Sequence, residues 1–459
     1  MFDLKEFRKP SFVESVSLLA IVFIILGAPI IFMKGLQPHI PIIWAIVFLL
    51  IYGLFKRVKF DSMQSDMIQA VSTSMAAVYL FFFIGILISV LMIAGTIPTL
   101  IYYGLNVMSV KTFYLSSFLL TAIIGVSIGS SLTTTATLGV ALLGLAHVFH
   151  LNPAITAGAI VSGAFFGDKM SPLSDTTGIA ASIVGIDLFE HIKNMMYTTI
   201  PAFIISSIFF TVLSPWKAAT AHASLSSFRE EILSTGLVSP ISLLPFVLLI
   251  VFSILKFPAV VSIIVVSIVG CSIAIFEHNV ELSNLAFILF DGFHAKNAPS
   301  DLAHLLNRGG INSMFFTITI VILALSLGGL LFSLGIIPTI LNKMSNFLNS
   351  QFRATVCVIL TAVGVNVIIG EQYLSILLAG KTFKPVYDKL NLPSRNLSRT
   401  LEDAGTVINP LVPWSVCGVF ITNALGVTPI EYAPFSIFCY SSLILTFLSG
   451  VFSLFKEKP

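Results

Sequence analysis

Residues 167–178, GDKMSPLSDTTG, concentrate side chains that could bind a metal ion. Two carboxylates and four hydroxyl groups lie around Pro172, which has no N–H group to donate and interrupts a helix. The interruption leaves backbone carbonyl oxygens without helical partners. Carboxylate, hydroxyl and carbonyl oxygens together form the ligand set that a small hard cation prefers. The candidate ligands are Asp168, Asp175, Ser171, Ser174, Thr176 and Thr177, and Lys169 lies among them.

The chain around this segment has the composition of a polytopic, all-α membrane protein. Of its 459 residues, 56% are hydrophobic and only 10% are charged, whereas a soluble domain is about 25% charged. Residues 67–110 and 112–167 contain no Asp, Glu, Lys or Arg. Each of these runs is long enough for two crossings, and we expect about 10–12 membrane segments of about 20 residues in the whole chain.

The polar segment lies inside a single interrupted span, residues 153–187. Neither arm of this span is long enough to cross alone, so we expect the helix to stop near residue 167 and to resume near residue 176. Unwound backbone at membrane depth is tolerated where it is buried or lines a cavity. Two alternatives stay open. One is an ordinary loop between helices, and the other is an ion pair between Lys169 and one of the two Asp residues, because a lone intramembrane ammonium is costly.

The sequence repeats itself at an offset of 240 to 241 residues. AGTIPTLI at 94–101 recurs as LGIIPTIL at 334–341. The stretch that begins with the polar segment, 167–185, aligns without gaps with INPLVPWSVCGVFITNALG at 408–426, and Asp168 then falls opposite an Asn. A constant offset across separate blocks indicates an internal duplication.

The duplication predicts two halves, residues 1–213 and 240–459, joined by a polar and extracellular linker at 214–239. Each half is predicted to have an odd number of full crossings, so the two halves must be inverted relative to each other. Inverted repeats with broken helices place a substrate site near the membrane midplane.

Each half also contains a hairpin-like segment, at 113–149 and 353–380, and the second half has its own interrupted helix at 396–425. The hairpins carry polar residues at mid-membrane positions, and an intramembrane acid is a candidate functional residue. In the alternative interpretation, the small and hydroxyl residues only mediate helix packing. These segments add the candidates Ser130, Ser131, Thr134, Glu371, Gln372, Asn409 and Ser415.

The distribution of basic residues predicts the orientation. With a cytoplasmic N-terminus and hairpins that re-enter on their own sides, 17 Lys and Arg residues face the cytoplasm, six face outside, and Lys169 lies within the membrane. This excess satisfies the positive-inside rule and places both termini in the cytoplasm. Glu402 and Asp403 then lie at a cytoplasmic entrance, where capping with Arg399 is one interpretation.

The stretch SGAFFGDKMSPLSDTTGIAASIVGIDLFEHIKNM at 162–195 resembles the signature of NhaC-type sodium/proton antiporters, and 369–384 and 397–420 agree. The resemblance implies a two-repeat transporter of the bacterial cytoplasmic membrane that exchanges Na⁺ for H⁺ by alternating access. It also suggests a homodimer surrounded by lipid, with no cofactor and no nucleic-acid partner. Within the motif, Asp175 is our first candidate for the Na⁺ carboxylate and Asp168 is the alternative.

Three positions depart from the family pattern, namely GSSLTT at 129–134, Glu371 in place of Asp, and Asn409 in place of a frequent Ser. They leave open a Na⁺- and H⁺-coupled exchanger of small organic acids such as malate or lactate, whose carboxylate Lys169 could meet. A passive cation channel fits an inverted repeat less well. We expect no enzymatic activity, because GVSIG at 125–129 lacks the strand–turn–helix that a nucleophile elbow requires.

Overall fold

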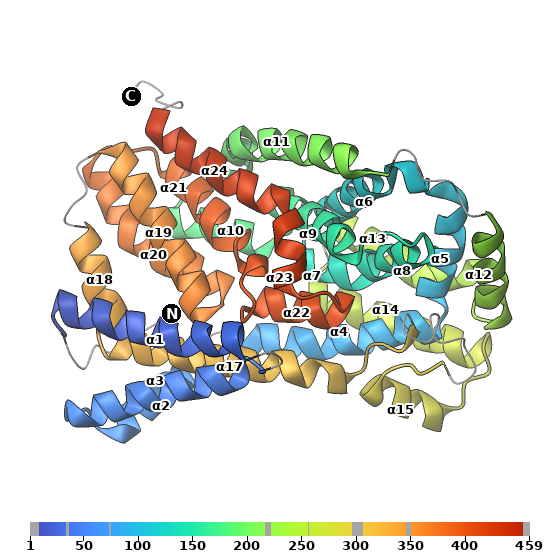
Figure 1. Ribbon diagram of the computed structural model, residues 1–459, viewed down its shortest axis with the longest axis horizontal. Helices are drawn as coiled ribbons and strands as arrows, with labels where there is room; N and C mark the ends of the chain where they lie inside the picture. Colours follow the sequence, from blue (N-terminus) through green and yellow to red (C-terminus); the bar gives the residue numbers. More distant parts are fainter. Residues whose placement is uncertain are drawn as a thin grey trace.

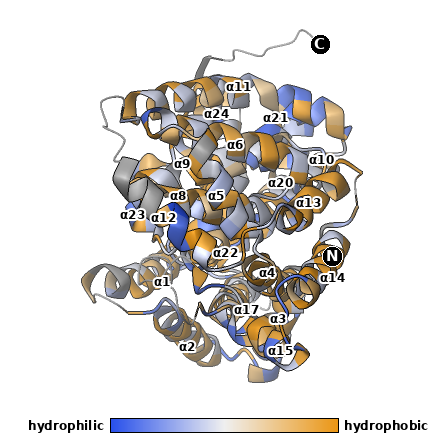
Figure 2. Cartoon of the chain, turned by 90° about the vertical axis from the view of Figure 1, so that its right-hand side faces the viewer, coloured by the Kyte–Doolittle hydropathy of each residue, from blue (hydrophilic) through white to orange (hydrophobic). Residues whose placement is uncertain are grey.

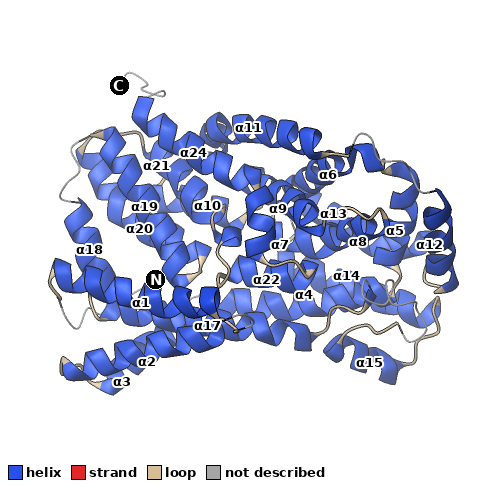
Figure 3. Ribbon diagram, viewed as in Figure 1, coloured by secondary structure: helices blue, strands red, loops and turns tan. Residues whose placement is uncertain are grey.

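The structure is a computed structural model that describes residues 9–33, 36–72, 75–215, 222–255, 257–295, 306–345 and 350–452. All regular elements within these residues are helical, and none of them is a β-strand (Figure 3). The prediction of an all-α fold is therefore confirmed. Residues 1–8 and 453–459, which form the predicted cytoplasmic ends, lie outside the described residues.

The helices of the first half and the linker are α1 (Phe12–Phe32), α2 (His39–Phe55), α3 (Phe60–Ser72), α4 (Met75–Ile93), α5 (Thr96–Val107), α6 (Phe113–Ile128), α7 (Ser131–Thr134), the π-helix η2 (Thr135–Gly139), α8 (Val140–Val148), α9 (Pro153–Met170), α10 (Asp175–Val184), α11 (Leu188–Leu213) and α12 (His222–Ser234). The predicted linker 214–239 thus contains a helix of its own, α12.

The helices of the second half are α13 (Leu244–Ile254), α14 (Ala259–Phe276), α15 (Leu282–Asp291), α17 (Ile311–Ser333), α18 (Ile336–Ser345), α19 (Gln351–Ile369), α20 (Gln372–Lys389), α21 (Ser394–Leu401), the π-helix η4 (Glu402–Thr406), the short 3-10 turn η5 (Asn409–Leu411), α22 (Val416–Leu425), α23 (Pro429–Tyr432) and α24 (Ile437–Phe452).

The composition of these helices is that of a multi-pass membrane protein. Among the described residues, six helices are long and apolar enough to cross a membrane, and there are up to nine spans if each bent helix pair counts as one. Large apolar side chains on their outer faces are exposed, as Ile204, Ile208 and Val212 are on α11. Viewed along the long axis, the helices at the perimeter are largely apolar (Figure 2). Lipid is the environment that such a surface requires.

The same turn geometry recurs at equivalent positions of the two halves. Gly129 ends α6 with φ 70°, and Gly370 ends α19 with φ 75°. Gly185 after α10 and Gly426 after α22 have φ 75° and 73°. This left-handed region is open to Gly at little steric cost. The backbone therefore repeats with the spacing of the sequence repeat.

The two hairpin-like segments approach the middle of the molecule from opposite ends of its long axis. The unit α6–α8 lies on the right of Figure 1 and α19–α20 on the left, with the ends of α9, α10 and α22 between them. This arrangement is compatible with inverted halves, and the inversion itself stays a prediction.

Close packing of small residues fixes the first hairpin against the interrupted helix. A Cβ atom on Gly163 of α9 would lie 2.3 Å from the carbonyl oxygen of Phe118, and one on Gly167 would lie 2.5 Å from the Cα of Gly125. Small residues let membrane helices approach this closely. The contact between α6 and α9 brings the tip of the hairpin to the break in the helix.

Candidate functional site

The first helix break lies between Met170 and Asp175. Helix α9 continues three residues beyond the predicted stop near residue 167, and α10 begins at Asp175, close to the predicted restart. Between them, the Ser171 N–H donates to the Asp168 carbonyl oxygen at 3.2 Å, and Ser174 occupies the N-cap position of α10. Pro172 explains the break, because it cannot donate to a preceding turn.

The tip of the first hairpin, between α6 and α7, packs directly against this break. A Cβ atom on Gly129 would lie 2.7 Å from the Leu173 Cβ and 2.8 Å from the Ser171 hydroxyl oxygen, so only Gly fits there. Immediately after the turn, the Ser131 hydroxyl donates to Oδ2 of Asp168 at 2.6 Å. The hairpin and the break therefore form one site rather than two.

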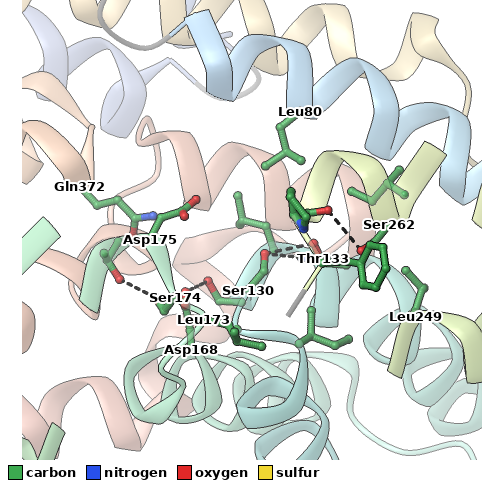
Figure 4. A pocket seen from close by; sticks show the side chains of 18 of the residues that line it. Leu80, Ser130, Thr133, Asp168, Leu173, Ser174, Asp175, Leu249, Ser262 and Gln372 are labelled. Atoms are coloured by element: carbon green, nitrogen blue, oxygen red, sulfur yellow. Dashed lines mark hydrogen bonds between the residues drawn. The ribbon is translucent and has the colours of Figure 1, made fainter. Parts of the chain in front are cut away.

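A cavity of about 240 Å³ lies at this junction (Figure 4). Its walls come from the hairpin tip, the break, the first turn of α20, and helices α4, α13 and α14. Both carboxylates of the break line it. The predicted residues in its wall are Asp168, Asp175, Ser174, Thr176, Ser130, Ser131 and Gln372.

The two carboxylates differ in their surroundings. Asp168 is 5% exposed and accepts the hydrogen bond from Ser131. Asp175 is an exposed residue at the first turn of α10, and no hydrogen bond joins its side chain to any described residue. Both lie where a cation in the cavity could meet them. The lining that the structure describes includes Asp168 and Asp175 but no Lys, Arg or His, so it offers acidic groups and no basic one.

Three other predicted residues of this region form hydrogen bonds with nearby backbone groups. Ser171 accepts the N–H of Leu173 at 3.2 Å, and the Thr177 hydroxyl donates to the Lys169 carbonyl oxygen at 3.3 Å. The Thr134 hydroxyl donates to the Ser130 carbonyl oxygen at 2.9 Å. None of the three is among the cavity-lining residues.

The Lys169 side chain points away from the cavity into a buried polar cluster. Its ammonium group forms an ion pair with Oδ1 of Asp403 and donates to the Ser442 hydroxyl at 2.9 Å. Both ionic side chains are fully buried. The alternative that paired Lys169 with Asp168 or Asp175 is therefore wrong, because the partner comes from the second half.

Asp403 has further hydrogen bonds in this cluster. Its Oδ2 accepts the Thr198 hydroxyl at 2.8 Å and also accepts the Thr446 hydroxyl. Asp403 and Glu402 are both fully buried within the protein. The position of the two acids at the cytoplasmic entrance, with capping by Arg399, stays a prediction. They belong to the π-helix η4, in the interior of the helix bundle.

The second helix break, between η4 and α22, contains neutral polar residues that form hydrogen bonds with one another and with nearby backbone groups. The Asn409 amide donates to Oδ1 of Asn366 at 2.8 Å and to the Gly370 carbonyl oxygen at 3.1 Å, and its own Oδ1 accepts the N–H of Cys417. Ser415 caps α22 by accepting the Gly418 N–H at 3.0 Å. Neither Asn409 nor Ser415 lines the cavity, and their polar atoms are already engaged.

The second hairpin lies next to both the second helix break and the cavity. Glu371 caps α20, and its Oε2 accepts the Leu374 N–H at 2.6 Å, so this acid does not line the cavity. The next two residues, Gln372 and Tyr373, do line it. The tip of α20 contacts the first break, and through this contact the second half contributes residues to the cavity wall.

Sequence reasoning missed several members of these networks. Thr133 and Tyr373 line the cavity beside predicted residues, and their positions at the hairpin tips were the available signal. Asn366 donates to the Gly405 carbonyl oxygen at 2.6 Å and braces the second break. It lies one helical turn before the Gly370 turn, and no pattern in the sequence marks it.

Comparison with known proteins identifies the family of the chain. The family model described as "Na+/H+ antiporter family" matches residues 163–454. The chain is 39% identical to the Na(+)/H(+) antiporter NhaC of Alkalihalophilus pseudofirmus over 91% of each chain. It is 37% identical to the NhaC of Bacillus subtilis over 91% of this chain and 93% of that one. It is also 30% identical to the malate-2H(+)/Na(+)-lactate antiporter of Bacillus subtilis, over 97% and 96% of the two chains.

Proposed function

The chain belongs to the Na⁺/H⁺ antiporter family and is a Na⁺/H⁺ antiporter, and we propose that the exchange takes place in the cavity lined by Asp168 and Asp175. One observation carries this assignment. Two carboxylates from a helix break meet in a cavity whose described lining holds no basic side chain. Such a site attracts cations and has a group that can bind either Na⁺ or H⁺.

In this mechanism one carboxylate exchanges its proton for Na⁺. Asp175, which is exposed and unbonded within the described structure, is the group that an entering ion meets first. Asp168, held by Ser131, completes the ligand set together with hydroxyl and carbonyl oxygens of the break. On one side of the membrane the proton leaves and Na⁺ binds. On the other side Na⁺ leaves and the carboxylate takes up a proton, so one site suffices to couple the two ions.

We place the protein in the bacterial cytoplasmic membrane with both termini in the cytoplasm. The distribution of Lys and Arg supports this orientation. Phe257 and Pro258, which join α13 to α14 on the predicted cytoplasmic side, line the cavity.

The organic-acid alternative finds less support in the site. It requires a cation for the substrate carboxylate, and Lys169 is bound to Asp403 outside the cavity. An organic anion would face Asp168 and Asp175 without a counter-charge. The relative with this activity is also the more distant one, at 30% identity.

The experiment measures Na⁺-induced collapse of a pH gradient in everted membrane vesicles. We expect Asp175→Asn and Asp168→Asn each to reduce the response by at least about tenfold, because an amide cannot exchange a proton for Na⁺. Asp388→Asn, at an exposed position on α20, is the matched control and should keep the wild-type response. Full activity in both cavity variants would refute the assigned site.

A further inference from the structure

Glu402 is a buried acid without a role in the exchange described above. It begins the π-helix η4 and has no exposed surface. Its Oε2 accepts the Thr406 hydroxyl at 2.7 Å. Its Oε1 is buried as well and has no hydrogen-bond partner among the described residues. An ionised carboxylate in such a place is costly unless it is paired, so we expect Glu402 to carry a proton.

The charged groups around Glu402 also favour the neutral acid. Asp168 and Lys169, two consecutive residues of α9, interact with it electrostatically, and so does the adjacent Asp403. The one ammonium group among them already forms an ion pair with Asp403. An ionised Glu402 would thus be the third carboxylate around a single ammonium group, and like charges at close range disfavour ionisation.

The other buried basic side chains of this cluster act on Asp403. Arg399 of α21 and His191 of α11 both interact with it electrostatically. The His191 ring is hydrogen-bonded through Nδ1 to the Ser398 hydroxyl at 2.8 Å, and its Nε2 has no partner among the described residues. A charged ring would bury an N–H donor without an acceptor, so the ring is neutral. Within the described part of the chain, no ion pair joins Glu402 to a basic side chain.

Asp168 links Glu402 to the cavity. It lines the cavity wall, whereas Glu402 does not, and it interacts electrostatically with Glu402. Na⁺ in the cavity therefore meets Asp168 and Asp175 without contacting Glu402. The π-helix that Glu402 begins is a rare element, which occurs frequently at functional sites. Glu402 is thus placed to respond to the charge on Asp168 without being a Na⁺ ligand.

We propose that Glu402 is a proton-binding residue of the exchange, separate from the carboxylates that bind Na⁺. The inference rests on the proposed function, because Na⁺ still binds at Asp168 and Asp175. On the side where Na⁺ binds, the O–H bond of Glu402 breaks and its proton passes through Asp168 to water. The positive charge of Na⁺ beside Asp168 then offsets the third negative charge. On the other side Na⁺ leaves, and water supplies one proton to Glu402 and one to the cavity carboxylates.

This role raises the number of protons exchanged for each Na⁺ from one to two. The test uses purified protein in proteoliposomes whose interior is about tenfold richer in H⁺, with the membrane potential held at zero by valinomycin and equal K⁺ on both sides. ²²Na⁺ accumulates until its inside-to-outside ratio balances the proton gradient. Exchange of two protons stops at a Na⁺ ratio of about 100, and exchange of one proton stops at about 10. We expect about 100 for the wild type.

Glu402→Gln removes the proton-binding group and keeps its shape, because the amide has the size of the neutral acid but cannot release a proton. We expect this variant to exchange Na⁺ for H⁺, to unfold at the wild-type temperature, and to stop at a Na⁺ ratio of about 10. Glu402→Asp restores an ionisable group and should return the ratio to about 100. Glu281→Gln, at an exposed position directly before α15, is the matched control and should keep the wild-type ratio.

Three results would overturn the proposal. They are a Na⁺ ratio of about 10 in the wild type, a ratio of about 100 in Glu402→Gln, and a failure of Glu402→Gln to fold, since the amide replaces a neutral acid without removing a charge interaction. Absence of Na⁺-dependent proton movement in the wild type would instead refute the proposed function.

Discussion

At the scale of single residues, the two carboxylates of the site, which the sequence does not distinguish, have different environments. Asp168 is buried and accepts the Ser131 hydroxyl, whereas Asp175 is exposed to the cavity. A charge-assisted hydrogen bond of this kind fixes the carboxylate oxygen and lowers its freedom to turn away. Ser131 therefore acts on the ion through Asp168.

Replacing Ser131 tests this role. We expect Ser131→Ala to raise the KM for Na⁺ by about tenfold or more, because a hydrogen bond to a charged group contributes about 1.5–3 kcal/mol. The KM is measured from Na⁺-dependent proton movement in vesicles. Ser182→Ala, whose exposed hydroxyl donates only to the Ile179 carbonyl oxygen, should leave the KM unchanged. Equal KM values in both variants would contradict the role of Ser131.

We interpret the ion pair of Lys169 and Asp403 as a contact that stabilises the fold. Asp403→Asn leaves a buried ammonium without its counter-charge, which costs about 3–5 kcal/mol. We expect a clearly lower unfolding temperature in detergent. The double variant Lys169→Met/Asp403→Leu should recover much of the loss, because a buried pair can be replaced by apolar groups. Wild-type thermal stability in Asp403→Asn would show that the pair does not hold the fold.

The sequence could identify Lys169 as a residue in need of a partner but could not find that partner. Asp403 lies 234 residues away, and the nearer Asp168 and Asp175 were equally eligible by charge. Only the packing of α9 against η4 and α24 decides between them. By contrast, Pro172 acts on its own backbone, so the helix break itself could be predicted to within a few residues.

At the scale of elements, each hairpin tip meets a helix break at a glycine. Gly129 has φ 70° and no room for a side chain beside Leu173 and Ser171. Gly370 has φ 75°, and its carbonyl oxygen accepts the Val416 N–H at 2.8 Å. These contacts set the distance between Ser131 and the carboxylate it holds.

We expect Gly129→Ala to impair both exchange and thermal stability. The left-handed backbone alone costs an alanine about 1–2 kcal/mol, and its Cβ would also collide with Leu173. Gly178→Ala is the matched control, since no atom lies within 4 Å of the Cβ that it adds. Exchange rate and unfolding temperature are measured for both variants. If Gly129→Ala behaved like Gly178→Ala, the tip would not depend on close approach.

The hairpins show what element-level patterns can and cannot predict. Glycine and hydroxyl residues inside apolar runs correctly indicated turns near 129 and 370. The patterns did not distinguish Glu371, which caps its own helix, from Gln372, which lines the cavity. Side-chain direction at a helix N-terminus depends on capping geometry, and adjacent residues there point to different surroundings.

At the scale of the whole molecule, the two predicted halves carry different residues at their helix breaks. The first break carries Asp168 and Asp175, while the equivalent break of the second half is closed by the amides of Asn366 and Asn409. The second half also supplies Asp403, which neutralises Lys169. The sequence predicts the repeat, whereas this division of roles depends on contacts between residues far apart in the sequence, which no sequence pattern marks. The result is one cavity that offers acidic groups and no basic one among its described lining residues.

The central claim is that this cavity exchanges Na⁺ for H⁺ without another substrate. The most direct measurement uses purified protein in proteoliposomes with an acidic interior and no organic acid. We predict that ²²Na⁺ accumulates, that the internal pH rises, and that the double variant Asp168→Asn/Asp175→Asn shows neither change. Accumulation of ²²Na⁺ that required added malate or lactate, or that persisted in the double variant, would contradict it.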